Sequence, residues 1–379
     1  MPLHRPVRAE VDLGAIRHNA ALLRAHADPA ELMAVVKADG YGHGAVPSAQ
    51  AALDGGATWL GVALVEEGEQ LRAAGIRAPI LVLSEPPPAA ATAMLEADLT
   101  PTVYTHRFVQ ALVAAGRDRG SGPVAVHLKL DTGMRRVGLI EPLWDEVFGY
   151  LARSADITVT GIWSHLAVGD EPGNPYTVQQ TSLFASGVER ARAAGLAPDL
   201  VHLANSGGTQ LGAGVAGEQA VGVHHDLVRT GIAVYGLEAA PGIRLDGLRP
   251  AMSLRSELTL VKPVLAGQQL SYGLRFTAAH DTVIGTVAGG YADGIRRGLT
   301  NTGQVWVGGR RVPIVGTVSM DQITIDLGPE ATDTAGDDVW LFGGPDETCV
   351  TVEEWASWLD TITYEVTCGI SARVPRVYR

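Results

Sequence analysis

The sequence predicts two domains, an N-terminal (β/α)8 TIM barrel over residues 1–240 and a mostly-β domain over residues 241–379. The barrel is indicated by short apolar runs that alternate regularly with helical stretches, an order typical of parallel α/β folds. The second domain is indicated by apolar residues at every second position beyond Pro241, a period that favours half-buried strands. A length of 379 residues agrees with this division, because single cores stop growing at about 250–300 residues.

The expected barrel strands are short and continuously apolar, as in parallel strands buried on both faces. They lie at residues 32–36, 59–64, 80–83, 101–104, 124–130, 157–163, 200–203 and 231–235. Helices are expected at residues 14–26, 65–74, 89–96, 106–115, 142–153 and 176–194. Strands and helices alternating in this way over roughly 230 residues fit one (β/α)8 barrel.

In the second domain, strands are expected at residues 257–262, 282–287, 304–307, 312–315 and 338–342. A turn at residues 308–311, which opens on two glycines, is expected to join two of them in a hairpin. Thr351 and Glu354 have the spacing of a capping box, so a helix is expected to begin after Thr351.

The composition limits the kinds of partner that the protein can bind and the cell compartment in which it is expected. The net charge of −12 argues against nucleic acid or an anionic membrane surface as a partner. No apolar run is long enough to span a bilayer, and the first ten residues lack the hydrophobic core of a secretion signal. The two cysteines, which form no CxxC pair, are typical of a reducing compartment. A cytoplasmic protein is therefore expected.

Polar residues gather where the expected barrel strands end, which is where barrel enzymes carry their active sites. Lys37 and Tyr41 follow the first strand, and Arg229 precedes the eighth. The fifth, sixth and seventh strands lead into Lys129, Asp131, Arg136, Ser164, His165, His202, Asn205 and Ser206. Because this set combines cations with imidazoles and small donors, it predicts an anionic ligand. No metal site is expected, since the adjacent His224 and His225 lack a carboxylate-rich ligand spacing.

Two short segments favour a phosphate as part of that anion. Residues 205–209 are small and glycine-rich, and residues 230–232 lie by the last strand, where barrels often bind phosphate through backbone N–H groups. Lys37 has two interpretations: its stem could cover apolar surface with the amine in water, or a desolvated amine could form a Schiff base. A phosphate site beside a strand-end lysine favours pyridoxal 5'-phosphate held covalently by Lys37.

Residues 35–44, Val-Val-Lys-Ala-Asp-Gly-Tyr-Gly-His-Gly, resemble the cofactor attachment motif of the alanine racemases. Further segments similar to this family follow in the family's order at residues 128–138, 204–206, 229–236, 271–273, 290–294, 315–321, 363–366 and 373–376. The similarity spans essentially the whole chain. The sequence is therefore identified as a member of this family of pyridoxal-phosphate-dependent racemases of fold type III.

The resemblance implies that Lys37 holds the cofactor and is one of two acid/base groups that interconvert L-alanine and D-alanine. Tyr272 resembles the opposing base, which the second subunit of a homodimer with shared active sites would supply. Two groups are needed because the α-proton leaves one face of the amino acid and returns to the other. The product D-alanine would supply peptidoglycan, the cell-wall polymer.

The resemblance also assigns the surrounding residues. Arg229 resembles the residue that hydrogen-bonds the pyridine nitrogen, with His165 bridging it toward Tyr272. Because arginine keeps its proton, the ring nitrogen stays unprotonated and the cofactor is a weaker electron sink, which favours racemisation over transamination. Further cofactor ligands are implied at Tyr41, Asn205, Ser206, Gly231, Ile232 and Tyr364, and substrate contacts at Arg136 and Met320. The implied supporting residues are Lys129, which is often carbamylated in the family, His202 and Asp321.

Three positions depart from the family's pattern. Arg135 stands where a small or amide residue is frequent, Thr230 where proline is frequent, and Ser319 where cysteine is frequent. Serine or broad-specificity racemases, amino-acid decarboxylases and non-catalytic cofactor carriers on the same barrel are the alternatives. The absence of a signal core disfavours exported broad-specificity enzymes, and the lack of an anionic partner for the ring nitrogen disfavours a decarboxylase. The β domain with Tyr272 disfavours a carrier.

Overall fold

The computed structural model describes residues 5–120, 122–212 and 222–379, which divide into two compact units. The barrel unit comprises residues 16–41 and 45–249. The β unit comprises residues 42–44 and 250–379 together with the N-terminal segment up to residue 15. No helix in the described ranges is both long and apolar enough to cross a membrane.

The barrel unit contains eight parallel strands in the order β10-β2-β3-β4-β5-β6-β8-β9. Their bounds are β2 Glu31–Val35, β3 Trp59–Val62, β4 Ile80–Val82, β5 Thr100–Val103, β6 Val124–Asp131, β8 Ile157–Trp163, β9 Leu200–His202 and β10 Leu227–Thr230. Between β9 and β10 the sheet has no regular ladder, but single bonds run from Asp226 N to the Val201 carbonyl (3.0 Å) and from Arg229 N to the Ala204 carbonyl (3.0 Å). The predicted barrel is confirmed, in a nearly closed form.

The predicted eighth strand at residues 231–235 is wrong. The strand is β10, Leu227–Thr230, and Ile232–Tyr235 forms the 3-10 helix η5. Residues 232–235 are fully buried, which explains their apolar run without a strand. Gly236 ends this turn in the left-handed region at φ 77°.

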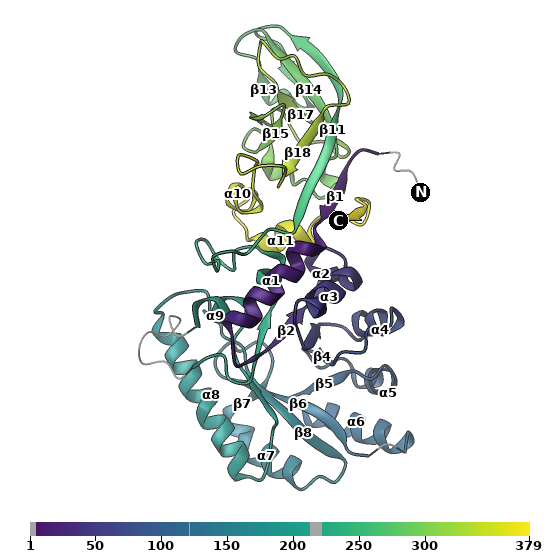
Figure 1. Cartoon of the computed structure of the whole chain (residues 1–379), viewed down its shortest axis with the longest axis vertical. Helices are drawn as coiled ribbons and strands as arrows, with labels where there is room; N and C mark the ends of the chain where they lie inside the picture. Colours follow the sequence, from purple (N-terminus) through teal and green to yellow (C-terminus); the bar gives the residue numbers. More distant parts are fainter. Residues whose placement is uncertain (1–4, 121, 213–221) are drawn as a thin grey trace. The chain divides into compact units, whose positions relative to one another are not determined.

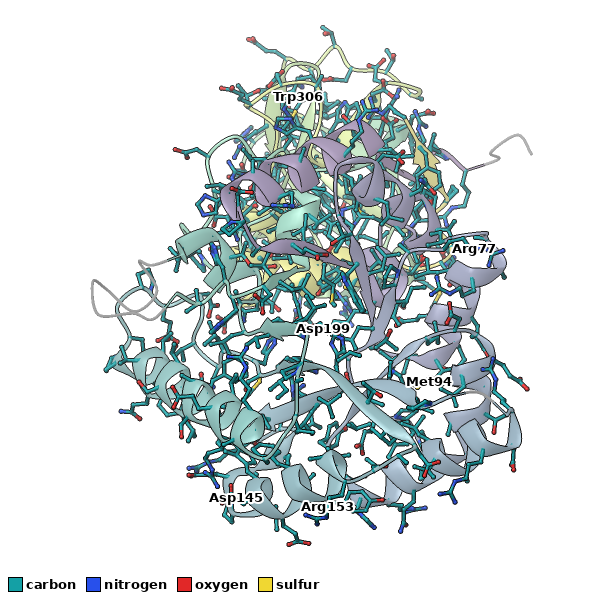
Figure 2. The ribbon with its side chains drawn as sticks, turned by 60° about the horizontal axis from the view of Figure 1, so that its bottom comes forward. Arg77, Met94, Asp145, Arg153, Asp199 and Trp306 are labelled. Atoms are coloured by element: carbon teal, nitrogen blue, oxygen red, sulfur yellow. The ribbon has the colours of Figure 1, made fainter. Side chains whose placement is uncertain are left out.

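Helices cover the outside of the barrel strands, as Figure 1 shows for α4, α5 and α6. Their bounds are α1 Leu13–His26, α3 Ala45–Asp54, α4 Val65–Ala73, α5 Ala91–Glu96, α6 His106–Asp118, α7 Trp144–Ala152, α8 Pro175–Ala193 and α9 Ser206–Leu211. Short 3-10 turns, η1 Pro88–Ala90 and η2 Glu141–Leu143, precede α5 and α7, and β7 Leu139–Ile140 lies beside β6. Figure 2 shows Asp145 and Arg153, on and directly after α7, at the outer margin of this unit.

The β unit is built on the long strand β11, Met252–Val264, whose neighbours are β1 Arg8–Val11, β14 Thr282–Ala288 and β18 Asp338–Phe342. The remaining strands are β12 Gln269–Leu270, β13 Phe276–Thr277, β15 Gln304–Val307, β16 Arg310–Pro313, β17 Gln322–Asp326 and β19 Arg376–Tyr378. Strand β1 lies between β11 and β19, so the first residues belong to this unit, which differs from the predicted division. The barrel unit extends to residue 249, where Asn19 exchanges hydrogen bonds with both backbone groups of Arg249.

Two local predictions in the β unit can be compared with the structure. The predicted hairpin is confirmed, because β15 pairs antiparallel with β16, and its turn is shorter than expected, consisting of Gly308 and Gly309 at φ 55° and 80°. The two following arginines belong to strand β16 because they pair with β15. The capping box is confirmed: Thr351 Oγ1 accepts from Glu354 N (3.2 Å), and the Glu354 carboxylate accepts from Thr351 N (2.9 Å). Helix α10, Val352–Trp358, follows it, and then α11, Thr363–Cys368.

Candidate active site

The barrel unit brings its predicted site residues together at the carboxyl ends of the strands. Lys37 follows β2, Lys129 lies near the end of β6, and Arg229 lies in β10. The charges of Lys37, Arg136 and Arg229 each lower the pKa of Lys129 and also that of His165, which places these five residues close to one another. The strand-end residues therefore form one cationic cluster.

The chain turns sharply after Lys37. Ala38, Asp39 and Gly40 have left-handed helical angles (φ 52°, 53° and 61°), and Tyr41 follows at φ 53°. For residues other than glycine this conformation costs roughly 1–2 kcal/mol each, so surrounding contacts must hold it. This strained turn lies directly beside the candidate catalytic lysine.

Carboxylates hold this left-handed turn in place. The Glu67 side chain accepts from Ala38 N (2.6 Å), and the Asp39 side chain accepts from Ala45 N (2.8 Å), where α3 begins. The turn carries the ring of Tyr41 against Gly231, where a Cβ atom would lie 2.7 Å from Tyr41 Cζ and closer still to the hydroxyl oxygen. Only glycine leaves room for the phenol at this point.

Ser206 lies beside Gly231 at this close contact. Gly231 N donates to Ser206 Oγ (2.9 Å), and Asn205 caps α9 by accepting from Gly208 N (3.0 Å). Thr230 is fully buried, and its hydroxyl has no hydrogen-bond partner among the described residues. Hydroxyls and backbone N–H groups gathered around a close backbone approach suit a phosphate.

Arg229 is 3% exposed, and its hydrogen-bond partners among the described residues are all uncharged. Its Nη2 donates to the carbonyls of Ser164 (2.7 Å) and Leu203 (2.9 Å) and lies 3.3 Å from His165 Nδ1. Its Nη1 lies 3.1 Å from His202 Nδ1. Burial lowers the pKa of Arg229 to about 9, so the guanidinium remains charged at neutral pH.

The imidazoles around Arg229 are neutral. Burial, and then the charge of Arg229, lower the pKa of His165 and of His202 far below the ordinary value. Since arginine has only donors, the Nδ1 atoms of both rings must accept, and their protons reside on Nε2.

Lys129 is buried, at 5% exposure, and forms no ion pair with a carboxylate in the described ranges. Its pKa falls to about 7, first through burial and then through the charges of Arg229, Arg136 and Lys37. Lys129, Arg136 and Arg229 form no ion pair within the described part of the chain, a cationic surplus that an anionic ligand would balance.

Two residues that the sequence did not single out organise this cluster. The Trp163 ring lies 4.0 Å from Lys129 Nζ and 4.6 Å from Arg229 Cζ, so one indole stabilises both cations. Gln180 on α8 is fully buried; its amide accepts from Ala167 N (2.8 Å) and donates to the His165 carbonyl (3.1 Å). A tryptophan ending an apolar run and a lone glutamine on a helix give no functional signal in sequence.

Tyr272, Met320, Asp321 and Tyr364 belong to the β unit. Tyr272 begins the 3-10 turn η6, Tyr272–Leu274, and is 75% exposed. Thr317 Oγ1 donates to the Tyr272 carbonyl (2.7 Å), and Ser271 Oγ donates to the Thr317 carbonyl (2.7 Å), so the backbone of this turn is held. Met320 is 52% exposed and lines the same hollow of about 710 Å³ as Tyr272, and Asp321 pairs with Arg373 (2.7 Å).

One departure from the motif pattern, Arg135, has a structural explanation. Arg135 is exposed and has φ 55°, a conformation that glycine or asparagine adopts at lower cost, which explains the small or amide residue frequent there. Ser319 lies in a turn in which its N–H donates to the Gln322 carbonyl (3.0 Å).

The fold and this cluster define a (β/α)8-barrel enzyme whose candidate site combines a strand-end lysine, hydroxyl and backbone donors that suit a phosphate, and a surplus of cations. Residues 11–239 match the family model of the alanine racemase N-terminal domain, and residues 251–378 match that of the alanine racemase C-terminal domain. The chain belongs to the alanine racemase family, as its resemblance predicted.

Curated relatives and solved structures agree with this assignment. The chain is 45% identical to the alanine racemase of Symbiobacterium thermophilum over 99% of this chain and 97% of that protein. It is 44% identical to that of Thermobifida fusca over 98% of this chain and 97% of that protein. It superposes on the alanine racemase of D-cycloserine-producing Streptomyces lavendulae with a TM-score of 0.94, at 40% identity over 100% and 98% of the two chains. Alanine racemase from Streptomyces coelicolor A3(2) gives a TM-score of 0.93, at 40% identity over 99% and 98%.

Proposed function

We propose that this chain interconverts L-alanine and D-alanine, with Lys37 and Tyr272 as the two acid/base groups and pyridoxal 5'-phosphate as cofactor. The observation that carries the proposal is the strand-end cluster, in which Lys37 lies among cations that have no carboxylate partners in the described ranges. Such a cluster binds a group with several negative charges and an amino-acid carboxylate.

The residues present fit the cofactor. The close approach of Tyr41 to Gly231, with the Ser206 hydroxyl and the buried Thr230 hydroxyl beside it, offers donors to a phosphate. Tyr41, Asn205, Ser206, Gly231, Ile232 and, from the β unit, Tyr364 would hold it. Bound to the Lys37 amine, pyridoxal phosphate supplies the electron sink that acidifies the α-proton of the substrate.

Arg229 determines how strong that sink is. Its Nε has no hydrogen-bond partner among the described residues, so an N–H is available for the ring nitrogen. With a pKa of about 9 it keeps its own proton at neutral pH and leaves that nitrogen unprotonated. The weaker sink favours rapid return of a proton, and hence racemisation over transamination.

Arg136 and Met320 are proposed to orient the substrate, with Lys129, His202 and Asp321 in support. With a pKa of about 7, part of the Lys129 amine is neutral and can add CO2, which gives a carbamate and one released proton. The carbamate would be an anionic partner for Arg136.

Tyr272 is proposed to act in the site of a second subunit. A phenol that is 75% exposed on its own chain is available to a partner, and His165, whose Nε2 carries the proton, would donate toward it. We propose a homodimer in the cytoplasm, where it would supply D-alanine for peptidoglycan.

The test is a racemisation assay of the purified holoenzyme against alanine, serine and lysine, followed by optical rotation or chiral chromatography. We expect alanine to be turned over with the highest kcat/KM. Preferential turnover of serine or lysine would replace the proposal with a serine or broad-specificity racemase. No turnover of any of the three would refute it.

A further inference from the structure

A row of hydrogen bonds leads from Arg229 into the interior of the barrel. Arg229 Nη1 lies 3.1 Å from His202 Nδ1, and His202 Nε2 lies 3.0 Å from His127 Nδ1. His202 and His127 are completely buried, and Arg229 is nearly so. His127 lies in β6, far enough inside the barrel that it does not belong to the set of strand-end residues.

The donors and acceptors in this row are ordered in one direction. Arg229 can only donate, so His202 Nδ1 accepts, and the proton of this neutral ring resides on Nε2. His202 Nε2 then donates to His127 Nδ1, and the His127 proton resides on its own Nε2. If His202 carried its proton on Nδ1, two donors would face each other beside the cofactor site.

The barrel is shaped to keep the His127 ring in this place. Opposite His127 in β8 is Gly161, where a Cβ atom would lie 2.6 Å from three atoms of the imidazole. The Trp59 ring packs against the His127 ring, with 5.2 Å between the two centroids. The Trp163 ring stacks on His202 at 5.5 Å and 8°. Packing alone would be satisfied by an apolar side chain, so the polar row requires another reason.

We propose that His127 is a positioning residue for the racemisation: by accepting from His202 it fixes the tautomer of His202 that receives the Arg229 N–H, and so holds the guanidinium toward the cofactor. The proposal rests on the proposed function for the role of Arg229 at the cofactor. The tautomers themselves follow from the geometry of this chain.

Kinetics of four holoenzyme variants test this role. His127→Leu removes the acceptor at similar volume, and His127→Asn keeps an oxygen acceptor close to the position of Nδ1. Gly161→Ala displaces the ring without removing it. Thr102→Val is the matched control, because Thr102 is the fully buried neighbour of His127 on β5 and its hydroxyl has no partner among the described residues.

We expect His127→Leu and Gly161→Ala to lower kcat by about 10- to 100-fold with KM changed less than about threefold, and to shift the visible absorption of the bound cofactor. His127→Asn should stay within about fivefold of the parent in kcat, and Thr102→Val should be unchanged. An equal loss in His127→Leu and His127→Asn, or an unchanged kcat in His127→Leu, would overturn the proposal. A similar loss in Thr102→Val would also overturn it, since any change in the barrel interior would then suffice.

Neutron diffraction from crystals of the deuterated parent protein tests the tautomers directly. We expect deuterons on Nε2 of both His202 and His127 and none on either Nδ1. A deuteron on His202 Nδ1 would refute the inference even if the protein racemises alanine. Failure to racemise any amino acid, with the expected deuterons present, would refute the proposed function instead.

Discussion

Substitution of Gly231 by alanine tests whether the close approach of Tyr41 builds the phosphate cradle. The added Cβ would lie 2.7 Å from Tyr41 Cζ, whereas ordinary contacts begin at 3.4 Å, so the ring would have to withdraw by roughly 0.7 Å. The ring cannot withdraw easily, because it packs against Tyr235 at 5.3 Å between centroids. Overpacking of this kind costs about 1–3 kcal/mol. If that cost falls on the bound state, the Kd of the cofactor rises by about 5- to 150-fold.

The assay is fluorescence or absorbance titration of the apoenzyme with pyridoxal phosphate, with the free energy of unfolding measured in urea alongside. Gly122→Ala is the matched control, because Gly122 is an exposed glycine whose added Cβ meets nothing within 4 Å, and it should leave the Kd unchanged. Tyr41→Phe added to Gly231→Ala removes the most crowded atom and should recover part of the affinity. Unchanged cofactor affinity in Gly231→Ala would refute the cradle.

Arg135→Asn should raise the free energy of unfolding by about 0.5–1 kcal/mol in urea melts, because asparagine tolerates φ 55°; a destabilisation would contradict this, and Arg119→Asn at φ −76° is the control. Uptake of 13C-labelled CO2 by Lys129, followed by NMR, should increase as the pH rises from about 6 to about 8, since only the neutral amine reacts and its pKa is about 7; a signal that persists in Lys129→Arg would exclude this lysine. Tyr272→Phe should slow deuterium exchange of L-alanine by about 10²–10⁴-fold and that of D-alanine far less, whereas equal losses would refute the assignment of faces. Mixed Lys37→Ala and Tyr272→Phe subunits should recover about a quarter of the parent activity if sites are shared, and none if each chain is complete.

The fold was largely predictable because its strands are apolar runs of the right length between helices. The prediction failed where burial and strand formation diverge: residues 232–235 are apolar because they are buried, while the strand is β10, which contains the charged Arg229. It also failed to anticipate that β1 joins the β unit, because four residues carry no information about which distant strands they pair with.

The sequence predicts those site residues whose side chains are themselves chemically distinctive. Lysines, arginines and histidines at strand ends stand out, and they do lie together. The residues that hold these side chains in place could not be identified from the sequence. Trp163, Gln180 and Glu67 act through a ring face, an amide and a carboxylate placed by tertiary packing, and each would be an ordinary residue in any helix or strand.

The partners of Arg229 explain how a buried arginine can serve this chemistry. A carboxylate partner would stabilise its charge and keep its pKa high, but it would also cancel the field that the guanidinium exerts on a ligand. Two carbonyls and two neutral imidazoles instead lie around its Nη1 and Nη2 atoms without neutralising it. Burial then lowers its pKa only to about 9, so it remains charged. The row through His202 to His127 extends this arrangement, because the neutral His202 ring accepts from Arg229 and donates to His127, whose own Nε2 has no partner among the described residues.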